Sequence, residues 1–139
     1  MGYTVVPSTN SEVPSNCPYR FVAKLNSRDN VPNIEDIACT AGDVYEISAY
    51  VACAQGVHSF NLMVFEKDFK DGNNLGYPSG GGLAPTSVWT KRVWRWTVRD
   101  GVTFFKPLLQ IDTFDNSTVW YATNWKVTNI SAAAKAQST

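Results

Sequence analysis

The sequence predicts an all-β fold, and two observations carry the prediction. Hydrophobic residues recur at every second position in several segments, which is the period of a half-buried strand. Glycine, proline, asparagine and aspartate gather between these segments, as they do in turns. A chain of 139 residues suffices for one domain around one core. Short strands punctuated by turns are typical of an antiparallel β-sandwich or jelly roll.

Residues 43–53 give the clearest strand. One face of this strand carries Tyr45, Ile47, Ala49, Val51 and Cys53, and the other carries Glu46, Ser48, Tyr50 and Ala52. Residues 59–65 are apolar on almost every position, which predicts a strand covered on both sides. Further strands are expected over 102–113 and 117–130. Residues 27–40 have room for one helical turn at most, and we find no internal repeat or convincing helix before residue 131.

The stretch KRVWRWTVR, residues 91–99, holds four cations and two tryptophans. At a period of two, Trp94 and Trp96 fall on one face with Val98. A helix would place the two tryptophans roughly 200° apart, so no single helical face would bury both. We therefore expect a strand with its tryptophans in the core and Lys91, Arg95 and Arg99 on an exposed face.

A glycine-rich segment, KDGNNLGYPSGGGLAPTS, covers residues 70–87. Its glycines, prolines and asparagines predict a loop without regular structure. A long loop inside a compact domain is more often functional than idle. We expect this loop to border a binding site.

Composition excludes several classes of protein. The 12 basic and 12 acidic residues leave no net charge, so no nucleic-acid partner is expected. No hydrophobic run approaches the roughly 18 residues of a membrane span, so we expect neither membrane insertion nor a signal peptide. The three cysteines, Cys17, Cys39 and Cys53, are an odd number and predict free buried thiols in a reducing compartment.

Signals for catalysis are sparse, and we do not expect an enzyme. His58 is the single histidine, so any triad would have to include it, and its turn setting predicts a surface side chain. The cysteines lack the close spacing of a zinc site, and the glycine run lacks the GK[ST] of a phosphate loop, so no metal or cofactor is expected. Four carboxylates lie on or beside predicted strands, namely Glu46, Glu66, Asp100 and Asp112, and nothing in the sequence pairs them. A small glycosidase, which needs two carboxylates flanking one bond, is therefore the third hypothesis.

Aromatic residues are more numerous than one core requires, with 5 Trp, 6 Tyr and 7 Phe. A flat aromatic face covers the apolar face of a sugar ring, and polar side chains bind its hydroxyl groups. The arginines suit an anionic sugar because a guanidinium binds a carboxylate or phosphate with two hydrogen bonds. The predicted ligand-binding residues are Trp89, Tyr50, Tyr77, Arg95, Arg99 and Lys91.

Four segments together resemble a known family. In order they are GDVYEISAYVACA, FNLMVFEKD, SVWTKRVWRWTVRDGVTFFKPLLQID and STVWYATNWKVTNIS. This series is similar to carbohydrate-binding modules of the family four, nine and twenty-two type. The resemblance implies a jelly roll, non-catalytic sugar binding, and ligand contacts at Trp89 and Tyr50. The family's closing strand usually carries an Asp where this chain has Thr123 and Asn124, so a structural calcium ion is not supported.

The end of the chain has a second resemblance. VTNISAAAKAQST is similar to junctions in phage tail-tip and tail-fibre proteins, where a sugar-binding domain precedes an alanine-rich coiled coil. We expect residues 1–9 to be an N-terminal arm that begins with residues added for expression. A β-sandwich is expected over 10–130, and the start of a helical linker or coiled coil over 131–139. The resemblance implies a virion protein, trimeric through the coiled coil, that binds a bacterial surface glycan. The alternatives are a ligand-free structural spacer of a fibre, or a polysaccharide-binding module of a secreted glycoside hydrolase.

Overall fold

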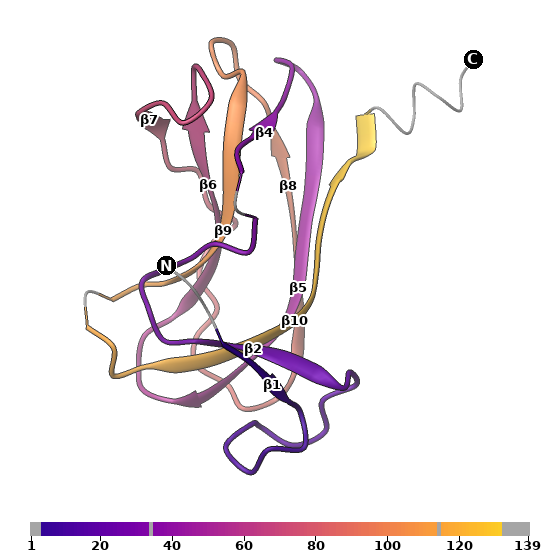
Figure 1. Ribbon diagram of the computed structural model, residues 1–139, viewed down its shortest axis with the longest axis vertical. Helices are drawn as coiled ribbons and strands as arrows, with labels where there is room; N and C mark the ends of the chain where they lie inside the picture. The colour runs from indigo at the N-terminus through magenta and orange to yellow at the C-terminus, as the bar shows by residue number, and fades with distance from the viewer. Residues whose placement is uncertain (1–3, 34, 114, 132–139) are drawn as a thin grey trace.

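The computed structural model describes residues 4–33, 35–113 and 115–131, which form a sandwich of two antiparallel sheets (Figure 1). The first sheet has the order β1 (Thr4–Pro7), β2 (Phe21–Leu25), β10 (Val119–Asn129), β5 (Val44–Gln55) and β8 (Thr90–Thr97). The second has the order β3 (Asp29–Asn30), β9 (Phe104–Ile111), β6 (Phe60–Lys67) and β7 (Asn74–Gly76), and β4 (Ile37–Ala38) also pairs with β9. The predicted all-β sandwich is confirmed.

The core lies between the sheets, where the predicted alternation holds. In β5, the five residues of the expected apolar face are all buried, with Ile47 and Val51 at 0% exposure. Trp96 of β8 packs against Phe105 of β9, with ring centroids 4.8 Å apart, and Tyr45 packs against the same Phe105 at 4.7 Å. These three rings join the two sheets, and aromatic pairs at such distances add to the stability that apolar burial gives.

β8 has the two unlike faces that the sequence predicts. Trp96 is buried and Trp94 is half-buried against the core, whereas Lys91, Val93 and Arg95 are exposed. The strand pairs along its whole length with β5, which places Lys91 opposite Tyr50. β8 ends at Thr97, so the predicted exposed face stops short of Arg99.

The first sheet begins earlier than the sequence predicts. Residues 4–7, expected in an N-terminal arm, form β1 and pair with β2. The connection between these strands, residues 8–20, folds back onto the outer face of the sheet and forms a second, smaller cluster around Val13, Val22 and Tyr121. Part of this outer face is therefore covered.

The segment over 70–87 is more regular than predicted. It contains β7, which pairs with the end of β6 (Figure 1). Beyond β7 the chain continues along the edge of β6: the amide of Val64 donates to Pro78 at 3.0 Å, and the amide of Gly80 donates to Leu62 at 2.9 Å. The predicted absence of regular structure is therefore wrong, because backbone pairing with β6 holds the segment as an irregular edge strand.

Of the predicted C-terminal helix, only the first residue, Ser131, lies within the described residues, so the helix stays a prediction. Ile130 and Ser131 have a helical backbone, and the Ser131 hydroxyl accepts a hydrogen bond from the amide of Val44 at 2.8 Å. The rest of the predicted alanine-rich helix over 131–139 lies outside the described residues. In the described part of the chain all three cysteines are free.

Gly80 is expected to tolerate no side chain. A Cβ atom at this position would lie 2.8 Å from Cγ and 2.9 Å from Cβ of Trp94, closer than packed atoms approach. We expect Gly80→Ala to lower the free energy of unfolding by about 1–3 kcal/mol, as overpacking does. Gly82→Ala is the matched control, since its Cβ would meet its nearest neighbour at 3.4 Å. Urea denaturation measures both, and equal midpoints would show that Trp94 moves freely.

Candidate functional site

A groove crosses the outer face of the second sheet. Its cavity has a volume of about 410 Å³ and is lined by Arg28, Asp29, Met63, Phe65, Asn74, Tyr77 and Gln110. The lining residues come from β3, β9, β6 and β7 in that spatial order, and from residues beside β3 and β7. Met63 and Phe65 alternate along β6 with the core residues Leu62 and Val64, so their side chains point out of the sandwich.

One end of the groove is aromatic. The rings of Phe65 and Tyr77 meet edge to face, with centroids 5.5 Å apart, and Tyr77 is 60% exposed. The edge contact fixes the orientation of Tyr77 and leaves much of its ring in solvent. An exposed and oriented ring of this kind offers a flat apolar surface to a ligand.

Polar groups line the rest of the groove. The side-chain amide of Gln110 donates to Asp29 at 3.3 Å and approaches the sulfur of Met63 at 3.4 Å. Gln110 is only 5% exposed, so packing and hydrogen bonds fix its orientation. Amide, carboxylate and guanidinium groups beside an apolar surface suit a ligand that has both hydroxyl groups and apolar C–H faces.

A buried ion cluster covers the outer face next to the groove. The carboxylate of Asp36 lies 3.4 Å from Nζ of Lys67 and 3.5 Å from Nζ of Lys106. The amide of Asp71 donates to the same carboxylate at 2.7 Å. Burial raises the pKa of Asp36, but the hydrogen bond from Asp71 and the two ammonium groups outweigh burial and hold the pKa below its ordinary value. Lys106 pairs in register with Phe65, so this cluster lies beside the groove.

Of the six residues predicted to bind a ligand, Tyr77 lines the groove. Tyr50, Lys91 and Arg95 lie together on the outer face of the first sheet, on the other side of the sandwich. There Tyr50 packs against Tyr19 with ring centroids 5.8 Å apart, and Arg95 is ion-paired with Glu46 at 3.1 Å. The predicted residues therefore form no single site.

Trp89 is placed by packing. Its indole N–H donates to the carbonyl of Pro14 at 2.9 Å, and its ring packs against the cluster around Val13 and Tyr121. The side chain is half-buried under residues 8–20. Nothing in the pattern of residues 8–20 predicted that this connection packs over the sheet.

Arg99 also differs from its predicted place. Its Nε donates to Oε1 of Glu66 at 2.8 Å, and its other nitrogen donates to the carbonyl of Leu75 at 3.4 Å. Glu66 lies on the inner face of β6 and is 4% exposed. Arg99 therefore compensates a buried carboxylate and holds β7, instead of extending the exposed face of Lys91 and Arg95.

The sequence did not identify most of the groove. Phe65 and Met63 were predicted to be covered, yet both are half-buried and line the cavity. Gln110 and Asp29 were not predictable as a pair, because β3 is two residues long and Asp29 pairs with Gln110, 81 positions further along the chain. The one feature of the sequence that pointed to the groove was the pair of apolar residues at outward positions of β6, Met63 and Phe65.

The two glutamates considered for glycoside hydrolysis lie on different sheets. Glu46 is on the outer face of the first sheet, whereas Glu66 is on the inner face of the second, so they do not flank one bond. Within the described residues, no three metal-binding side chains gather closely enough to hold an ion. A search of the same residues for a helix able to cross a membrane finds none.

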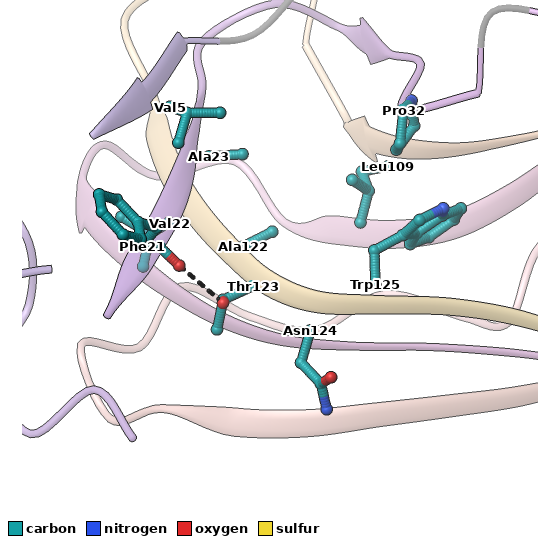
Figure 2. A pocket seen from close by; sticks show the side chains of 10 residues that line it. All are labelled: Val5, Phe21, Val22, Ala23, Pro32, Leu109, Ala122, Thr123, Asn124 and Trp125. Carbon is teal, nitrogen blue, oxygen red and sulfur yellow. Dashed lines mark hydrogen bonds between the residues drawn. The ribbon is translucent and has the colours of Figure 1, made fainter. Parts of the chain in front are cut away.

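A second cavity, of about 180 Å³, lies between the sheets at the side of β1 and β2 (Figure 2). Its walls are largely apolar and include Val5, Phe21, Pro32 and Trp125. The Thr123 hydroxyl donates to the carbonyl of Phe21 at 2.8 Å, shown as a dashed line in Figure 2. The indole N–H of Trp125 donates to Asn33 at 3.0 Å. With these polar groups engaged, the cavity suits a hydroxyl-rich ligand less well than the groove.

Comparisons with solved structures agree with this architecture. The CBM22-1 xylan-binding domain of Paenibacillus barcinonensis Xyn10C has a TM-score of 0.61 at 14% identity, over 90% of this chain and 78% of that domain. The CBM22-1–GH10 structure of Clostridium thermocellum xylanase 10B, complexed with xylohexaose, has a TM-score of 0.61 at 12% identity, over 94% of this chain and 25% of that one. The enzymatically active domain of tailspike protein 4 from bacteriophage CBA120 has a TM-score of 0.58 at 13% identity, over 91% of this chain and 18% of that one.

These comparisons establish the fold. The identities are 14% and 12%, so the similarity concerns the fold alone. The fold is the jelly-roll sandwich that the sequence resemblance implies. The chain spans a quarter or less of the xylanase and tailspike structures. No protein-family model matches the sequence, and no curated protein matches it.

Arg99 and Arg95 offer a matched pair of substitutions. We expect Arg99→Ala to lower the free energy of unfolding by about 2 kcal/mol, because it leaves the carboxylate of Glu66 buried without its cation. Arg95→Ala should cost about 0–1 kcal/mol, since its ion pair with Glu46 is exposed. Urea denaturation of both variants measures the difference, and equal losses would contradict the structural role of Arg99.

Asp36 gives the fold a pH dependence. Because its folded-state pKa lies below the ordinary 3.8, its contribution is complete above that value and is lost as the pH falls through the folded-state pKa. We expect Asp36→Asn to be less stable than the wild type by about 2–3 kcal/mol at neutral pH, because the substitution leaves two ammonium groups without their carboxylate. The difference in stability between the two proteins should become smaller in acid, where the Asp36 carboxylate is protonated. Thermal unfolding across the pH range tests this, and a constant gap would be the contrary result.

Proposed function

We propose that the protein is a non-catalytic carbohydrate-binding module whose ligand lies in the groove across the second sheet. One observation carries the proposal: the exposed ring of Tyr77, oriented by Phe65, lies in the same cavity as the fixed amide of Gln110. The ring covers the apolar face of a sugar, and the polar side chains bind its hydroxyl groups. Similarity in fold to a xylan-binding domain supports the same class of ligand.

The module acts, in this proposal, within a phage tail protein that recognises a saccharide on the bacterial surface. Two observations support this setting. The sequence at 127–139 is similar to junctions in tail-fibre proteins, and the fold is similar to part of a phage tailspike protein. A coiled coil after residue 131 would make the parent protein a trimer in the virion. A secreted glycoside hydrolase is the other setting that the similar structures support.

The outer face of the first sheet is the competing surface. Tyr50 packs against Tyr19 there, next to the exposed Lys91. This face has cations, which suit an anionic sugar. The groove is preferred because its polar groups converge on a concave surface, as those of ligand sites do.

Tyr77→Ala and Tyr50→Ala distinguish the two surfaces. Affinity electrophoresis of the purified protein would use gels that contain bacterial lipopolysaccharide, capsular polysaccharide, xylan or β-1,4-galactan. We expect a glycan to retard the wild type and Tyr50→Ala, and we expect Tyr77→Ala to lose most of that retardation, because the substitution removes the aromatic face that covers the sugar ring.

Each contrary outcome has a definite meaning. Retardation lost in Tyr50→Ala and kept in Tyr77→Ala would assign binding to the first sheet. No retardation in any gel would favour the structural spacer. Retardation by bacterial glycans alone would support the phage setting, and retardation by xylan or galactan alone would support a module of a secreted hydrolase.

A further inference from the structure

The groove does not end at the edge of the second sheet. A further cavity of about 400 Å³ lies beyond β3 and is lined by Asn26, Ser27, Arg28, Asp115 and Asn116. Arg28 lines this cavity and the groove alike, so the two cavities adjoin at this residue. We call this cavity the distal half, and the part that contains Tyr77 the proximal half.

The two halves differ in chemistry. The proximal half has the rings of Phe65 and Tyr77 together with Met63, whereas the distal half is lined by polar and charged side chains. Asn26, Asn116 and Asp115 are exposed and offer amide and carboxylate groups to a ligand. A ligand can stack in the proximal half and be bound by hydrogen bonds in the distal half.

The distal half is partly fixed before a ligand binds. The amide and hydroxyl of Ser117 donate to Oδ1 of Asp115 at 2.9 and 2.6 Å. On the other side, the amide of Ile111 donates to the carbonyl of Arg28 at 2.9 Å, which holds the backbone of Arg28 against the end of β9. Fixed polar groups of this kind cost little conformational entropy when they bind.

The length of the groove sets a minimum size for its ligand. The proximal half crosses four strands, from β3 to β7, which is about 14 Å at the usual spacing of neighbouring strands. The distal half adds further lining residues on the far side of Arg28 from β9 and β6, namely Asn26, Ser27, Asp115 and Asn116. One sugar ring fills only part of such a path, so full occupancy requires several linked units.

Charge narrows the class of ligand further. The lining of the two halves includes one cation, Arg28, and two anions, Asp29 and Asp115. This balance gives a polyanionic chain no net attraction, because each carboxylate repels the charge that Arg28 attracts. The arginines that suggested an anionic sugar, Arg95 and Arg99, lie elsewhere.

We propose that the two halves hold one continuous, uncharged polysaccharide segment, with one sugar unit against Tyr77 and later units bound by hydrogen bonds beyond Arg28. This inference rests on the proposed function of the groove. It adds that affinity grows with chain length until the distal half is filled. Contacts in the distal half are the reason why longer chains bind more tightly. It also adds that the ligand has no net charge.

The test uses oligosaccharides of graded length, prepared by partial hydrolysis of whichever polymer retards the protein most. Isothermal titration calorimetry would compare the wild type with Tyr77→Ala and with the double variant Asn26→Ala/Asn116→Ala. In the wild type, we expect the dissociation constant to fall as the chain lengthens. In the double variant, long chains should bind about tenfold more weakly, because two hydrogen bonds are lost, while the shortest bound chain is unaffected. Tyr77→Ala should weaken the binding of chains of every length.

Ionic strength tests the charge of the ligand. Binding of an uncharged chain should change less than twofold between low and high salt, because no counterions are released. A loss of affinity of tenfold or more in high salt would overturn the neutral assignment.

Failure of the inference and failure of the proposed function give different results. If Tyr77→Ala weakens binding but the double variant keeps the length dependence of the wild type, the distal half is not used and only the inference fails. If Tyr77→Ala binds every chain as the wild type does, the groove is not the site and both fail. Circular dichroism of the variants, which change exposed side chains, confirms that they are folded.

Discussion

A buried carboxylate joins the two sheets, and the shape of the groove depends on it. Glu66 projects from the inner face of β6, where a charge is costly unless it is paired and hydrogen-bonded. The indole N–H of Trp96 reaches it from the opposite sheet at 3.2 Å, and Arg99 completes the pairing at 2.8 Å. Arg99 also binds the carbonyl of Leu75, so the same interaction holds β7 at the edge of β6. Tyr77 follows directly after β7, and its position in the groove therefore depends on a charge inside the core.

The site is also defined by the surfaces that the chain covers. Residues 8–20 cover part of the first sheet and pack against Trp89, and the segment after β3 covers the second sheet around Asp36. At one side of the sandwich, Trp94 packs against the core and lies close to Gly80. At the other side, near β1 and β2, an apolar cavity remains (Figure 2). The outer face between β3 and β7 is the concave surface on which apolar and polar groups meet, and it leads past Arg28 into a second cavity.

The long strands were predictable because their signal is local. The segments predicted as strands coincide with β5, β6, β8, β9 and β10, and alternation in β8 assigned Trp96 to the core, since a two-residue period is visible within a few positions. Strands β3, β4 and β7 have two or three residues, too few for any periodicity, and exist because longer strands pair with them. The groove was predicted only at Tyr77. The rest depends on which outer face the connections leave uncovered, and pairings between residues far apart in sequence decide that.

Every tryptophan of this chain has a structural role. Trp89, Trp96, Trp120 and Trp125 donate their indole N–H to Pro14, Glu66, His58 and Asn33, and Trp94 packs on Gly80. The described residues that line the two halves of the groove include none of them. Intrinsic tryptophan fluorescence therefore reports whether the sandwich is folded, whereas ligand occupancy changes the surroundings of tyrosine. The two optical signals separate folding from binding, so an emission spectrum that stays constant during a glycan titration is compatible with full saturation.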